Sequence, residues 1–168
     1  MKKKANHRAS NWRWHIDEVF VKINGETHYL WRAVDHEGTA LDCYVTKRIN
    51  RKAALKVLKK LMSRHGEPKE IVTDKLPSYK AALRNIGAMN LQNTEQYKNN
   101  QAENSHLHFR RRERGMNKFR SMKSLQKFIS MQSVFQNHFN HQRHLENRDN
   151  FKNLRQNSVD QWRTICVK

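Results

Sequence analysis

The sequence predicts an α/β fold in which helices flank a mixed central sheet, made of a three-stranded antiparallel meander plus parallel strands. Within residues 12–46, three runs rich in β-branched and aromatic residues alternate with turn signals. The chain then changes to a helical period, and a short β-branched run follows that helix. A strand, a crossover helix and a second strand form the unit that produces parallel pairing.

The first strand is predicted over Trp12–Ile23. Its apolar residues fall on both parities, which indicates a central strand covered on both faces. Asp17 and Glu18 interrupt the apolar pattern, and a buried charge is costly unless it is paired or bound to a metal. Parity alone does not decide which of these two acids points at a site. Asn24-Gly25, which follows, is a strong signal for a two-residue hairpin.

Two more strands complete the predicted meander. Thr27–Asp35 should pair back on the first strand, and His36-Glu37-Gly38 turns the chain again. Leu41–Thr46 alternates apolar and polar residues, which predicts a third strand with one wetter face.

The crossover helix is predicted over Arg51–His65, where apolar residues recur at helical spacing. Gly66 ends this helix and Pro68 prevents its continuation. Glu70–Thr73 is then a short strand, predicted to be parallel to the first. Asp74 lies at the carboxyl end of that strand, where ligand sites of such sheets usually form.

Helices dominate the rest of the prediction. Pro77 opens one that Gly87 closes, Ala88–Asn100 is predicted to be a loop, and a basic helix follows. Apolar residues from Leu125 to Phe139 predict a long amphipathic core helix. A capping-box pattern at Ser158 predicts a last short helix. We divide the chain into a flexible basic arm at 1–11, a core at 12–145 and a helical extension at 146–168.

The charge of the chain limits its partners. Its 168 residues include 34 Lys and Arg but only 15 Asp and Glu, so the net charge is +19. Such an excess indicates a polyanion. Because the sequence has no long apolar run, signal peptide or lipidation motif, we expect nucleic acid and no membrane. Cys43 and Cys166 are far apart in the sequence, so we do not expect a structural zinc site. We expect the protein to lie in a reducing cytoplasm.

Three carboxylates are candidates for a common site. Asp17 lies on the first strand, Asp74 follows the fourth, and Glu103 lies on a later helix between an asparagine pair and a run of arginines. If these acids converge, divalent cations must offset their repulsion, and oxygen ligands favour Mg²⁺ or Mn²⁺. Two such ions support phosphodiester displacement. Asp35 and Asp42 also lie on predicted strands and remain alternatives from spacing alone.

A basic surface is predicted beside these acids. On a helix, Glu103, His106 and Arg110 share one face, and the arginines that follow suit phosphate neutralisation better than a merely solvated charge run. Arg110 and then Arg114 are expected to carry most of the phosphate contact. The candidate DNA-binding residues are Lys75, His106, Arg110, Arg111, Arg112, Arg114, Lys118 and Arg120.

Several segments together resemble bacterial insertion-sequence transposases of the DDE type, most closely the sixth insertion-sequence family, which has a ribonuclease-H-like integrase core. These segments read WHIDEVFVKI, YLWRAVDHEG, LDCYVT, IVTDKLPSY and YKNNQAENSHLHFRRRERGMNKF. The resemblance extends from Trp12 to His144. It implies that Asp17, Asp74 and Glu103 are the catalytic, metal-binding triad and that the other two strand acids, at positions 35 and 42, are structural or peripheral.

The resemblance implies a transposase that cleaves DNA at insertion-sequence ends and joins them to target DNA with two Mg²⁺ or Mn²⁺ ions. The expected partners are transposon ends, target DNA and further copies of the chain, in a homodimer or larger assembly at the bacterial nucleoid. Family members usually begin with a DNA-binding helix-turn-helix region, and only eleven residues precede Trp12 here. We therefore expect that domain to be missing. A nuclease of the same fold, and an inactive remnant that only binds DNA, remain alternatives.

Overall fold

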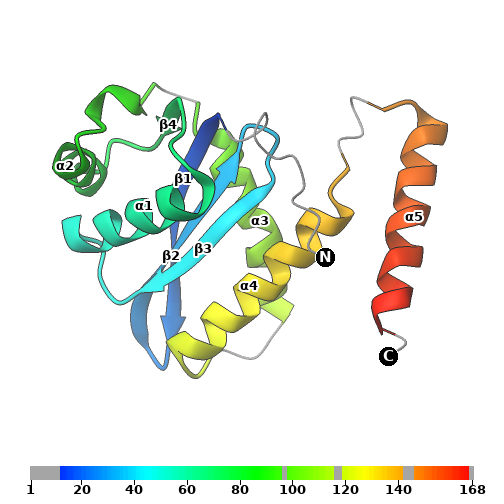
Figure 1. Ribbon diagram of the computed structural model, residues 1–168. Helices are drawn as coiled ribbons and strands as arrows, with labels where there is room; N and C mark the ends of the chain where they lie inside the picture. The colour runs from blue at the N-terminus through cyan, green and yellow to red at the C-terminus, as the bar shows by residue number, and fades with distance from the viewer. Residues whose placement is uncertain (1–11, 96–97, 116–118, 142–145, 167–168) are drawn as a thin grey trace.

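The computed structural model describes residues 12–95, 98–115, 119–141 and 146–166, without the side chains of residues 101 and 115. The predicted arm at 1–11 and the candidate Lys118 lie outside these ranges. The described strands form a five-stranded mixed sheet in the order β3-β2-β1-β4-β5 (Figure 1). Their bounds are Arg13–Ile23 (β1), Glu26–Asp35 (β2), Ala40–Thr46 (β3), Glu70–Val72 (β4) and Gln92–Asn93 (β5).

The predicted meander is confirmed. β1 pairs antiparallel with β2, and β2 pairs antiparallel with β3. Asn24 and Gly25 both have positive φ angles, 51° and 84°, as a tight hairpin turn between twisted strands requires. At the next turn the Asp35 carboxylate accepts hydrogen bonds from the backbone N–H groups of Glu37 and Thr39.

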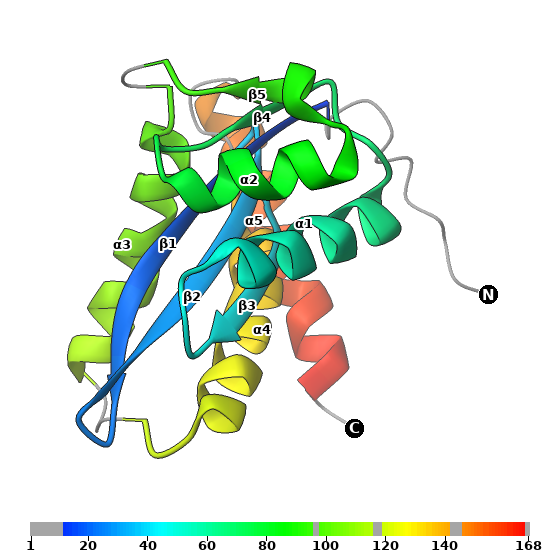
Figure 2. The same cartoon turned by 90° about the vertical axis from the view of Figure 1, so that its left-hand side faces the viewer.

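Helices cover both faces of the sheet, which confirms the predicted fold class (Figures 1 and 2). On one face, α1 and α2 pack against Trp14 and Ile16 of β1. On the other face, α3 and α4 pack against Val21 and Ile23 of the same strand. The helix bounds are Arg51–His65 (α1), Pro77–Ile86 (α2), the 3-10 helix Met89–Leu91 (η1), Asn100–Gly115 (α3), Met122–Phe139 (α4) and Arg148–Cys166 (α5).

The crossover helix α1 carries the chain from β3 to β4, and β4 pairs parallel with β1 as predicted. The bounds of α1 also agree with the prediction, because the signals that start and end this helix are local. The Asn50 side chain accepts a hydrogen bond from the backbone N–H of Ala53, and Gly66 ends the helix with φ 83°.

The Asn50 cap gives a test of this local stabilisation. We expect Asn50→Ala to lower the free energy of unfolding by about 1 kcal/mol because one backbone N–H of the first turn loses its acceptor. Asn50→Asp keeps an acceptor and should lose much less. Chemical denaturation of both variants measures the difference, and equal losses would mean that the cap contributes nothing.

Two predicted segments are corrected. The loop expected over Ala88–Asn100 contains η1 and the two-residue strand β5, which pairs parallel with β4. Glutamine and asparagine are poor strand formers, so β5 depends on tertiary pairing. The last helix was expected to begin at Ser158 but begins ten residues earlier, at Arg148. The prediction missed its first half because that half is polar and shows no apolar period. Ser158 is buried in mid-helix, and its hydroxyl donates to the carbonyl of Leu154.

The end of α4 is also less buried than predicted. Leu125 and Ile129 are core residues, but Phe135 remains 41% exposed. Its ring packs with Phe139 and with Trp162 of α5, which lies beside α4 at the outside of the molecule (Figure 1). Within the described residues, no helix has both the length and the apolar character needed to span a membrane.

Candidate active site

The candidate site forms where β1 and β4 separate. These strands pair only between Arg13–His15 and Glu70–Val72, so β1 continues past the last paired residue while β4 ends. Asp17 and Glu18 border the resulting opening on β1, and Asp74 follows β4. Carboxylate oxygens of these three acids lie within 4.8 Å of one another. The cluster therefore occupies the carboxyl end of the parallel pair, a usual position for a ligand site.

Asp17 and Glu18 reach the cluster from opposite faces of the sheet, because successive side chains alternate along a strand. On the α3 side, Nε2 of the buried His106 lies 3.1 Å from Oδ2 of Asp17. On the α2 side, the hydroxyl of the buried Tyr79 donates to Oε2 of Glu18 at 2.6 Å. Each acid is thus oriented by a residue of a different helix.

The electrostatics of this cluster are of the kind that a divalent cation would stabilise. Burial raises the pKa of Glu18 to about 7; the Tyr79 hydrogen bond opposes this shift, and the charges of Asp74 and Asp17 add to it. Partial burial raises the pKa of Asp74 too, against the hydrogen bond from the Leu76 N–H and with help from the charge of Asp17. A divalent cation would favour the charged form of these carboxylates and offset their mutual repulsion.

Glu103 lies in the first turn of α3, next to Asn99 and His106 along the helix surface. Asn99 donates from Nδ2 to the carbonyl of Ile16 at 3.1 Å, and His106 contacts Asp17. Glu103 stands between these two anchors at helical spacing, yet it is exposed and does not join the 4.8 Å cluster. The structure therefore brings Asp17 and Asp74 together and leaves Glu103 on the adjacent helix.

The strand pattern left open whether Asp17 or Glu18 points at the site, and the structure places both in the cluster. The sequence signal for Glu18 was the pair of adjacent acids in an otherwise apolar strand. The alternatives Asp35 and Asp42 have structural roles instead. Asp35 holds the turn after β2, while Asp42 accepts a hydrogen bond from the Tyr44 hydroxyl at 2.5 Å and contacts Arg64.

The predicted DNA-binding residues differ in solvent exposure and in their contacts within the chain. Lys75, Arg111, Arg112, Arg114 and Arg120 are exposed. Arg110 is half-buried: Nη1 donates to the Glu113 carboxylate at 2.6 Å, and Nη2 donates to the carbonyl of Phe20 at 2.7 Å. The Arg110 guanidinium therefore braces α3 against β1, and its phosphate contact stays a prediction, as does that of the buried His106.

Comparisons with known proteins agree with this architecture. Residues 11–142 match the IS240-type model of the transposase DDE domain. The chain is 36% identical over 112 residues to the Staphylococcus aureus transposases for the insertion sequence-like element IS431mec and for the element IS257 of transposon Tn4003. Each match covers 64% of this chain and 50% of the relative. The chain thus spans about half the length of these curated relatives.

Solved structures show the same fold at low sequence identity. The catalytic core domain of BIV integrase aligns with a TM-score of 0.57 and 16% identity, covering 79% of this chain and 87% of that one. The HTLV-2 integrase catalytic core, solved in complex with magnesium, aligns with a TM-score of 0.51 and 17% identity over 61% of this chain and 69% of that chain. The chain therefore belongs to the IS240-type family of transposase DDE domains and has the fold of an integrase catalytic core.

Proposed function

We propose that this chain is the catalytic core of a transposase, which cleaves DNA at insertion-sequence ends and joins the exposed 3′ hydroxyl to target DNA. The observation that carries the proposal is the meeting of the Asp17 and Asp74 carboxylates where the paired part of β1 and β4 ends, in a chain of net charge +19. Its membership of the transposase DDE domain family supports the same reaction.

In this proposal Asp17, Asp74 and Glu103 would hold two Mg²⁺ or Mn²⁺ ions, and the raised pKa of Asp74 fits such a donor set. Ions held there would supply activation of the attacking oxygen and stabilisation of the leaving oxygen of the phosphodiester. Glu103 is exposed on the helix face that His106 anchors to Asp17, so its flexible side chain supplies the third carboxylate from α3.

The remaining groups position the reactants. His106 orients the carboxylate of Asp17, and Tyr79 holds that of Glu18. Lys75, directly after Asp74, and the exposed arginines of α3 neutralise phosphates. Because two transposon ends are joined in one event, at least two copies of the core assemble on DNA, at the bacterial nucleoid.

The decisive experiment is strand transfer with pre-cleaved DNA from the ends of the element that encodes the chain, in Mg²⁺. We expect joining by the wild type, none by Asp74→Asn, and wild-type joining by Asp149→Asn on α5. Hydrolysis without joining would instead indicate a nuclease. DNA binding without any chemistry would indicate a remnant, and either result would overturn the proposal.

The basic surface gives a second measurement. Log affinity for duplex DNA falls linearly with log salt concentration, and each lost phosphate contact reduces the slope by about 0.9. We expect Arg114→Gln to show such a reduction on any DNA sequence, since Arg114 is exposed and forms no ion pair with a described residue. Arg155→Gln on α5 serves as the control. A change in sequence preference at constant slope would mean that Arg114 contacts a base edge.

A further inference from the structure

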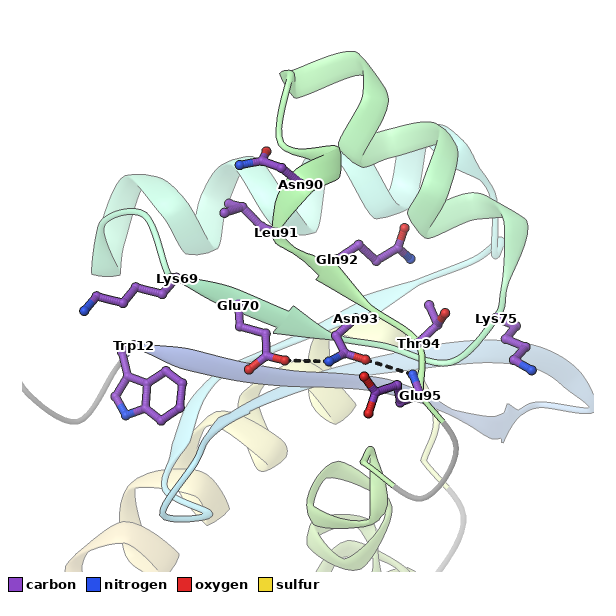
Figure 3. A pocket seen from close by; sticks show the side chains of 10 residues that line it. All are labelled: Trp12, Lys69, Glu70, Lys75, Asn90, Leu91, Gln92, Asn93, Thr94 and Glu95. Carbon is purple, nitrogen blue, oxygen red and sulfur yellow. Dashed lines mark hydrogen bonds between the residues drawn. The ribbon is translucent and has the colours of Figure 1, made fainter.

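A groove of about 700 Å³ runs along the β5 edge of the sheet, beside the candidate active site (Figure 3). We call it the edge groove and define it by Trp12, Lys69, Lys75, Gln92, Asn93 and Thr94, which line it. Lys75 directly follows Asp74 of the carboxylate cluster. The groove therefore begins next to the candidate site and leads away from it.

Both carboxylates that line the edge groove are neutralised by neighbouring cations. Glu70 forms an ion pair with Arg13, and the Glu95 carboxylate lies 2.6 Å from Nζ of Lys98. These acids therefore leave little net negative charge to repel an anion.

The two lysines of the groove have no such partner. Lys69 and Lys75 form no ion pair with any residue in the described ranges, and they lie at opposite ends of the groove (Figure 3). Since the strand β4 runs between them in the chain, their Cα atoms are separated by up to about 20 Å at a strand rise of about 3.3 Å per residue. This spacing suits an extended anion with several charges, not a single phosphate.

Trp12 provides an aromatic surface at one end. It is 36% exposed, whereas Trp14 and Trp31 are fully buried. Its backbone carbonyl accepts hydrogen bonds from the N–H groups of Lys69 (2.7 Å) and Glu70 (3.1 Å), which hold it at the groove. The Arg13 guanidinium lies 4.4 Å from the centroid of the Trp12 ring and the His36 ring lies 5.3 Å from it, so a base would stack on the part of the indole that these two side chains leave exposed. An exposed indole beside lysines is an arrangement that can stack an unpaired base.

Between the lysines, the amide side chains of the wall are held by hydrogen bonds. Asn93 donates from Nδ2 to Glu70 at 2.7 Å and accepts from the N–H of Glu95 at 2.9 Å (Figure 3). Gln92 donates from Nε2 to the Thr73 hydroxyl at 3.0 Å. Amides held in this way can bond to bases or sugars at little further cost in side-chain entropy.

We propose that the edge groove binds single-stranded DNA, with a base stacked on Trp12 and the backbone following Lys69 and Lys75. The source of that strand rests on the proposed function: it is an unpaired segment next to the phosphodiester in the candidate site. Duplex DNA does not fit this chemistry, because base pairing and stacking hide the base faces that Trp12 would contact.

The test compares oligo(dT) of about a dozen nucleotides with a duplex of equal length, measured by fluorescence anisotropy on the full chain in EDTA. We expect Trp12→Ala to weaken oligo(dT) binding by about 5- to 100-fold, the range for one lost base stack, and to change duplex binding less than about twofold. Trp12→Phe, which keeps an aromatic ring, should retain most of the affinity. Oligo(dT) should also quench the tryptophan fluorescence of the wild type more than that of Trp12→Phe.

Lys69→Gln keeps the test informative if Trp12→Ala fails to fold. It should weaken oligo(dT) binding and reduce its salt slope by about 0.7, whereas Lys52→Gln on α1, an exposed lysine outside the groove, should not. Unchanged oligo(dT) binding in Trp12→Ala and Lys69→Gln, or equal losses on oligo(dT) and duplex, would overturn the proposal. Asp74→Asn separates the two proposals, because it should lose strand transfer and keep oligo(dT) binding.

Discussion

Glu103→Gln is expected to abolish DNA cleavage and strand transfer while DNA affinity stays the same or rises slightly. The variant keeps the shape of the side chain but removes a charged oxygen ligand, so the loss in rate should reach about 1000-fold or more, equivalent to about 4 kcal/mol. Affinity should not fall, because the change removes a negative charge near phosphate. Glu103 is exposed in the first turn of α3, so its replacement should leave the core intact.

The measurements are strand transfer in Mg²⁺ and duplex affinity in EDTA. Glu113→Gln, on the same helix but paired with Arg110, is the matched control and should stay within a few-fold of the wild type. If Glu103→Gln lost DNA binding as completely as activity, Glu103 would be structural. If it kept full activity, Asp17, Glu18 and Asp74 would form the working site without it.

Glu18→Gln is expected to stabilise the metal-free protein at pH 8 and to lose this advantage toward pH 5. Burial raises the folded-state pKa of Glu18 to about 7, above its usual value of 4.5. Between these values the unfolded chain ionises first, so the stability of the wild type falls as pH rises through the interval and then levels off. The penalty removed by glutamine is about 2 kcal/mol above pH 7, after allowance for partial solvent exposure.

Thermal or chemical denaturation at several pH values, in EDTA and then in Mg²⁺, measures this effect. A cation in the cluster binds the folded state and offsets the same repulsion, so Mg²⁺ should stabilise the wild type more than Glu18→Gln at pH 8. Glu67→Gln, a change of an exposed glutamate, should follow the wild type throughout. A pH-independent difference between Glu18→Gln and the wild type would show that Glu18 is not buried as a charged group.

Together these two variants examine how the acids of the site divide their roles. Asp17 and Asp74 were predicted as site residues and lie together in the structure, and Glu18, which the strand pattern left open beside Asp17, joins them. The role of Glu103 as third ligand remains a proposal based on family resemblance and on its place between Asn99 and His106.

The sequence by itself determined the elements whose signals are local. Asn24-Gly25 specifies the hairpin because both residues accept positive φ. The apolar stripe, Asn50 and Gly66 specify α1, since periodicity and end signals lie within the helix itself. The parallel pairing of β4 follows from the crossover, so the meeting of Asp74 with an acid of β1 could also be predicted, while the choice of Asp17 came from the family resemblance.

Only the tertiary structure decided the features that depend on long-range packing. β5 exists because its backbone pairs with β4, although Gln92 and Asn93 are poor strand formers. Glu18 enters the site because β1 continues past the end of β4, which opens the sheet beside both faces of β1. Arg110 is engaged by Phe20 because α3 crosses β1 at that point. Such contacts join residues far apart in the chain, and no local pattern records which of them will meet.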